Sequence, residues 1–93
     1  MSTIINLYSD KSGEIKKFLE EFYQQKIELK NDLKWEKEFK NPIEIVEIIS
    51  AIIDNNNKFK INSWISLDNG IFINVTDSNL DQIIRYLYER YPY

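Results

Sequence analysis

The stretch WISLDNGIFINVTD, residues 64–77, predicts a β-hairpin and also its register. Apolar and polar residues alternate on both sides of the Asp-Asn-Gly segment, as in strands with one buried face. A three-residue loop at 68–70 pairs Ile65 with Ile73 and gathers the apolar residues on one face, whereas a two-residue loop mixes the faces. We therefore expect the three-residue loop, with Gly70 in the left-handed conformation that it requires.

The second face of this hairpin carries Trp64 and Phe72 among Asn, Ser and Thr, and the predicted register makes the two rings diagonal neighbours. One interpretation is that a helix docks there, with Ile4 and Tyr8 helping to form its docking surface. A four-stranded sheet is under ~20 Å wide and has room for about two helices of ~10 Å on each face. The other interpretation is an open binding surface bordered by Asn62, Asn74, Ser66 and Thr76.

The rest of the chain predicts two more strands and three helices from its periods of two and 3.6 residues. The predicted segments are strands at 3–9 and about 32–39, helices at 13–25, at 41–54 and from Ser78 to Pro92, and a turn at 55–59. The segment at 41–54 is rich in β-branched residues, which favours a strand. Its length, the capping residue Asn41 and Pro42 at the first helical position favour a helix, which we expect to be deeply buried.

These elements predict an α+β fold: a single two-layer domain over residues 1–93, in the order β-α-β-α-β-β-α. We expect a mixed sheet of about four strands that ends in the hairpin and is packed by amphipathic helices. Ninety-three residues are enough for one hydrophobic core. Trp35 is expected in that core, because it alternates with other apolar residues of its strand.

The composition excludes several kinds of chemistry, because the chain has neither cysteine nor histidine. Disulfides, zinc–sulfur sites and Ser-His-Asp triads are impossible within it. We expect no enzyme activity, no cofactor and no metal. The DSNLD segment at 77–81 resembles half of a calcium loop, but Gln82 stands where that loop needs glycine. Glu36 and Glu38 share a strand face, which we interpret as a solvated edge rather than a catalytic pair.

The charge balance argues against nucleic acids and anionic membranes as partners. The net charge is −3, every lysine lies at or before Lys60, and residues 61–84 contain no basic side chain. Phosphate binding needs a concentrated basic patch. The chain shows no signal peptide and no apolar run of ~20 residues, so we expect a cytoplasmic protein. Its abundance of Ile, Lys and Asn is typical of an AT-rich genome, and we expect a bacterial source.

Two hypotheses of function follow. The first is a small acidic, non-enzymatic interaction module that binds a protein partner or itself through the face of Trp64 and Phe72, or through a strand edge. The alternative is a small-molecule-binding domain with a pocket between sheet and helices, lined by Trp64, Phe72 and Tyr86. Tyr86 and Arg90 lie one helical turn apart and are expected either to hold an anionic group or simply to rim the last helix.

Overall fold

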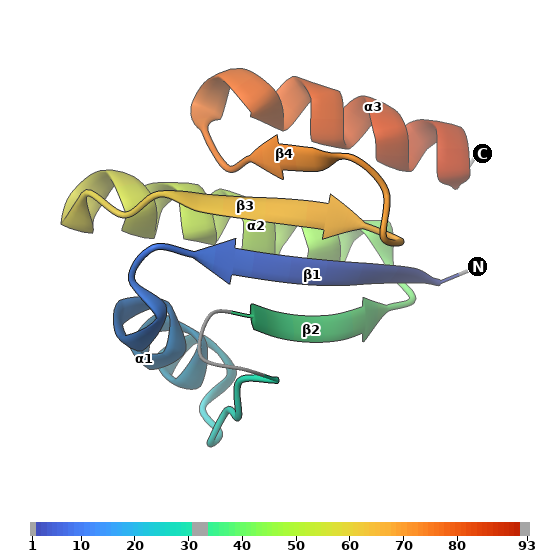
Figure 1. Ribbon diagram of the computed structural model, residues 1–93. Helices are drawn as coiled ribbons and strands as arrows, with labels where there is room; N and C mark the ends of the chain where they lie inside the picture. The colour runs from blue at the N-terminus through green and yellow to red at the C-terminus, as the bar shows by residue number, and fades with distance from the viewer. Residues whose placement is uncertain (1, 31–33, 92–93) are drawn as a thin grey trace.

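The computed structural model describes residues 2–30 and 34–91 and shows the predicted α+β fold (Figure 1). The element order β-α-β-α-β-β-α is confirmed, with one short 3₁₀ turn, η1, before the last helix. The elements are β1 (Thr3–Ser9), α1 (Ser12–Tyr23), β2 (Lys34–Phe39), α2 (Pro42–Phe59), β3 (Ser63–Leu67), β4 (Phe72–Asn74), η1 (Asp77–Asn79) and α3 (Leu80–Arg90).

The four strands form one sheet in the order β2-β1-β3-β4, with the N-terminal strand in the interior (Figure 1). All three neighbouring pairs are antiparallel, so the expectation of a mixed sheet is wrong. The connection through α2 does make β2 and β3 parallel to each other. However, β1 lies between them and runs in the opposite direction, so no two of the described strands form a hydrogen-bonded parallel pair.

The predicted hairpin register is confirmed, since Ile65 pairs with Ile73. The prediction for Gly70 is wrong: the left-handed residues are Asp68 and Asn69, with φ of 55° and 59°. Asp and Asn tolerate this conformation because their short side chains form local hydrogen bonds. Position 70 favours glycine for a steric reason instead, because a Cβ atom there would lie 3.0 Å from the carbonyl oxygen of Leu67.

Helix α2 continues to Phe59, so the predicted turn at 55–59 is also wrong. Asn56 points into the core, where it is 5% exposed and its Nδ2 donates to Ser63 Oγ at 2.6 Å. The helix ends where Lys60 takes a left-handed conformation, with φ of 54°. At its start, the predicted cap is confirmed, because Asn41 Oδ1 accepts a hydrogen bond from the backbone N–H of Ile43 at 2.9 Å.

Two other predicted helix boundaries move. The first helix ends at Tyr23 rather than at about residue 25. The last helix begins at Leu80 rather than Ser78, because residues 77–79 form the 3₁₀ turn. The start of the second strand at about residue 32 and the stop at Pro92 fall outside the described residues.

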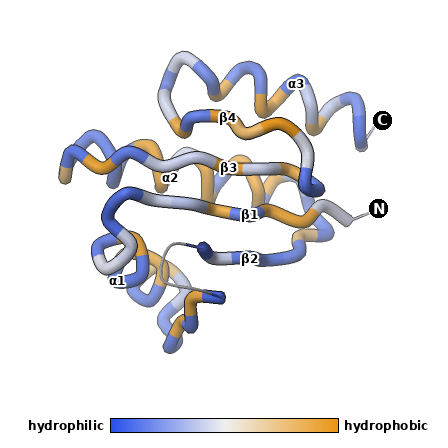
Figure 2. The backbone as a smooth tube through the Cα atoms, in the orientation of Figure 1, coloured by the Kyte–Doolittle hydropathy of each residue, from blue (hydrophilic) through white to orange (hydrophobic). Residues whose placement is uncertain are grey.

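One hydrophobic core holds the fold together. Alternate residues of the strands, among them Leu7, Trp35 and Ile65, pack against the inner faces of all three helices. Trp35 is therefore confirmed as a core residue. Apolar segments recur along α2 and the sheet (Figure 2). Because the helices share this one core, the described helices leave the opposite face of the sheet uncovered (Figure 1).

Candidate functional site

The uncovered side of the sheet is the candidate site, and we call it the open face. It consists of the strand residues that alternate with the core residues. These are Ile4, Asn6 and Tyr8 of β1, Lys34, Glu36 and Glu38 of β2, Trp64 and Ser66 of β3, and Phe72 and Asn74 of β4. Trp64 is 38% exposed and Phe72 is 59% exposed. The interpretation that a helix docks on these aromatics is therefore wrong for the described helices.

Tyr8, rather than Trp64, makes the ring contact with Phe72 on this face. The centroids of the Tyr8 and Phe72 rings lie 5.1 Å apart in an edge-to-face arrangement, a favourable geometry for aromatic pairs. Ser66, which pairs with Phe72 on the intervening strand, is 3% exposed. Its small side chain leaves room for the two rings to meet. Trp64 stands beside Tyr8 in the register, so three aromatic side chains from three strands form a cluster.

The floor of the open face is polar. Asn6 is fully buried there, and its Nδ2 donates to Asn69 Oδ1 in the hairpin turn at 3.0 Å. Its Oδ1 has no hydrogen-bond partner among the described residues. A buried amide fixes the spacing of the surrounding side chains because it tolerates few arrangements.

The predicted border residues lie at two different places. Asn74 is on the open face and donates from Nδ2 to the carbonyl of Ser63 at 3.3 Å. Asn62 lies just before β3, where its backbone N–H and its Nδ2 both donate to the carboxylate of Asp10, at 3.0 and 3.3 Å. Asn62 therefore links the start of β3 to the residue that follows β1, and its side chain is already engaged within the chain.

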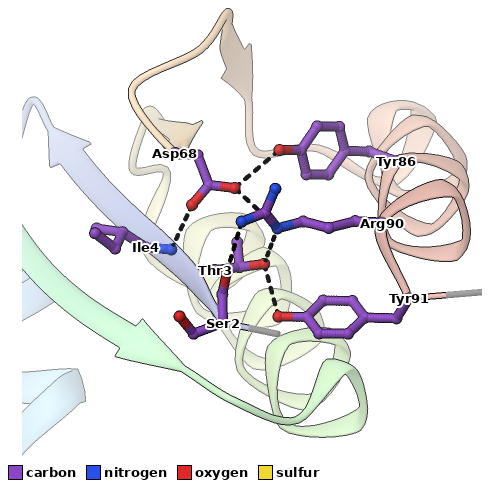
Figure 3. A network of polar contacts seen from close by, with 7 residues as sticks. All are labelled: Ser2, Thr3, Ile4, Asp68, Tyr86, Arg90 and Tyr91. Carbon is purple, nitrogen blue, oxygen red and sulfur yellow. Dashed lines mark hydrogen bonds and ion pairs between the residues drawn. The ribbon is translucent and has the colours of Figure 1, made fainter.

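Tyr86 and Arg90 lie on the helix side of the sheet and face a carboxylate of their own chain (Figure 3). Asp68 accepts hydrogen bonds from Tyr86 OH at 3.0 Å and from the backbone N–H of Ile4 at 2.9 Å, and it pairs with Arg90 Nε at 3.1 Å. Arg90 also donates to Thr3 Oγ1, on the buried side of β1. The anionic group predicted for Arg90 is thus supplied by Asp68.

This network also explains the chemistry of Tyr86. Burial raises the pKa of its hydroxyl, and the hydrogen bond to Asp68 and the charge of that carboxylate add to the effect. The side chains of Asp68 and Arg90 are 24% and 30% exposed, so the pair is only partly solvated. The arrangement docks α3 against β1 and the hairpin turn. Its evident role is structural.

A sizeable hollow lies elsewhere, between α2 and α3. It is a groove of about 620 Å³ and is lined by residues of those two helices and by Tyr91. A smaller hollow of about 320 Å³ includes Tyr86, but neither Trp64 nor Phe72 lines either one. The predicted pocket lined by Trp64, Phe72 and Tyr86 is therefore not formed, because the sheet separates the first two from the third.

The acidic segments singled out in the sequence have local partners. Glu36 Oε2 lies 3.0 Å from Lys30 Nζ and 3.7 Å from Lys34 Nζ, and the hydrogen bond from Lys30 lowers the pKa of its carboxyl group. Asp77 Oδ2 accepts a hydrogen bond from Asn57 at 3.2 Å. Within residues 2–30 and 34–91, no three His, Cys, Asp or Glu side chains gather closely enough to hold a metal ion.

Two further results concern the chain as a whole. None of the helices in the described ranges combines the length and the apolar character that crossing a membrane requires. Comparison with known proteins finds no matching family model, no matching curated protein and no matching solved structure.

Proposed function

We propose that this protein is a small, non-enzymatic interaction module that pairs with a second copy of itself through the open face. The observation that supports the proposal is the uncovered aromatic cluster of Tyr8, Trp64 and Phe72. Clustered exposed aromatics mark interaction surfaces more often than scattered ones do. We expect the module to act in the cytoplasm of a bacterium.

The edges of the sheet are less suited to this task than its face. The edge strand β2 carries the charged residues Lys34, Glu36, Lys37 and Glu38, and charged side chains discourage pairing with another strand. The other edge strand, β4, is only three residues long. A short edge strand offers few backbone groups to a partner.

The charges of the open face are compatible with self-association. Its charged strand residues are confined to β2 and include both signs, so a second copy meets no large patch of like charge. Two sheets can then stack at ~10 Å with their side chains interdigitated. The flat area of the face, with strands ~4.8 Å apart and residues ~3.3 Å apart, is roughly 300 Å². Because stable interfaces bury ~800 Å² per partner, we expect a weak, concentration-dependent dimer.

Sedimentation equilibrium over a wide range of protein concentration tests this proposal. The expected result is a reversible monomer–dimer equilibrium that Trp64→Ala weakens at least tenfold. A matched control is Ile43→Ala, which removes a 61% exposed apolar side chain of α2 and should leave the equilibrium unchanged. Fluorescence of a Trp35→Phe variant isolates Trp64, whose emission should shift to shorter wavelength as the dimer forms. A monomer at every concentration, with an unchanged Trp64 spectrum, would contradict the proposal.

A further inference from the structure

The groove between α2 and α3 has the dimensions of a helix-binding site. On α2, the residues that line it run from Pro42 to Asp54, about 18 Å of helix at 1.5 Å per residue. The small side chains of Ser50 and Ala51 lie along this length of α2. A helix of about three turns would match this length. The short side chains would also let such a helix approach α2 closely.

The groove is an apolar surface that stands open to solvent. Ile43 is 61% exposed and Tyr88 is 60% exposed, although both line it. A pocket for a small molecule encloses most of its ligand, usually 70–90% of the ligand surface. Large exposed apolar side chains along a helix-length trough instead favour an amphipathic helix as the occupant.

The charges around the groove define the partner further. Glu47 and Asp54 belong to its lining, and none of the described lining residues is basic. The hollow that adjoins it along α3 contains two more acidic residues, Asp81 and Glu89, and a single cation, Arg85. The rim is therefore negative, and complementary interfaces place positive charge against it.

We propose that this groove binds an amphipathic helix of a partner protein whose apolar stripe is flanked by lysine or arginine. A second copy of this chain fits less well, because it would bring its own Glu47 and Asp54 against the same acidic rim. The groove lies on the helix side of the molecule, whereas the open face is on the other side of the sheet. The inference goes beyond the proposed self-association and does not depend on it.

Two synthetic peptides of about 14 residues test the inference. Both carry leucine at positions i, i+3, i+4 and i+7, and the remaining positions are lysine in one and glutamate in the other. Titration of the ¹⁵N-labelled full chain, followed by amide chemical shifts, reports both affinity and location. The lysine peptide should perturb amides of α2 and α3 and bind at least tenfold more tightly than the glutamate peptide. Absence of those shifts overturns the inference.

Charge variants distinguish specific binding in the groove from a general attraction of basic peptides to an acidic protein. The double variant Glu47→Lys/Asp54→Lys changes exposed residues only, and it should reverse the peptide preference at least tenfold. The control Glu14→Lys/Glu21→Lys makes the same charge change on exposed positions of α1. Equal loss of lysine-peptide binding in both double variants would overturn the inference.

A third variant tests the shape of the groove and its independence from the open face. Ala51→Phe should fill the groove and abolish peptide binding, while circular dichroism confirms that the variant is folded. Trp64→Ala should leave peptide binding unchanged, so failure of self-association and failure of the groove are distinguishable. If the groove variants instead abolish dimer formation in sedimentation equilibrium, the groove is the contact between copies and the inference is wrong.

Discussion

Replacing Asp68 by asparagine tests whether the polar network of Figure 3 holds α3 against the sheet. Asparagine tolerates the left-handed φ of 55° and keeps an oxygen for the backbone N–H of Ile4. It loses the negative charge that Arg90 faces and the acceptor of the Tyr86 hydroxyl. The ion pair is partly solvated and contributes about 1 kcal/mol after screening, and the hydrogen bond contributes about 1 kcal/mol. We expect a loss of about 2 kcal/mol in the free energy of unfolding.

Urea denaturation followed by circular dichroism measures this loss. The midpoint should fall while the m-value stays constant, because the folded and unfolded surfaces are nearly unchanged. In thermal unfolding, the same loss corresponds to a decrease in Tm of roughly 8–16 °C for a domain of this size. The control Glu89→Gln makes the same chemical change at an exposed position of α3 and should stay within about 0.5 kcal/mol.

A double-mutant cycle with Tyr86→Phe sharpens the result. The two substitutions remove the same hydrogen bond, so their effects should be less than additive. If Asp68→Asn costs no more than Glu89→Gln, the network does not stabilise the docking of α3, and the structural role given to Arg90 is refuted.

The remaining predictions concern two glycines and a half-buried tyrosine. Gly70→Ala should destabilise the fold by about 1 kcal/mol, because its Cβ would lie 3.0 Å from a backbone oxygen. Gly13→Ala, with nothing within 4 Å and inside α1, should stabilise it by about 0.5–1 kcal/mol; thermal melts that rank the two variants the other way refute this reasoning. Burial, together with the charge of Glu44, raises the pKa of Tyr23 to about 12. The folded state therefore holds that proton more tightly than the unfolded state, and stability should fall as the pH rises from about 10 toward 12. Tyr23→Phe should reduce this alkaline loss in pH-dependent urea titrations, and it should cost nothing at pH 7, because the hydroxyl has no described hydrogen-bond partner. If the free energy of unfolding of Tyr23→Phe falls with pH between about 10 and 12 as steeply as that of the unsubstituted protein, the role given to the Tyr23 hydroxyl is wrong.

The elements and the hairpin register were predictable because they depend on local patterns. The alternation around residues 68–70 allows one pairing that keeps the apolar side chains together, and the structure has that pairing. The cap at Asn41 likewise acts within a few residues. The prediction is wrong at the asparagine-rich end of α2, because the local sequence there favours a turn. The contact of Asn56 with Ser63, on the next strand, is a tertiary interaction that overrides this preference.

The surfaces of the protein were decided by tertiary structure. The sequence by itself determined that Trp64 and Phe72 share a face, because side chains of a strand alternate with a period of two. Only the strand order brought Tyr8 to Phe72, and only the packing of α3 brought Arg90 to Asp68. Both contacts join residues more than 20 positions apart, and local periodicity contains no information about which distant segments become neighbours. The helices left the second face open because all of them bury their apolar stripes in one core.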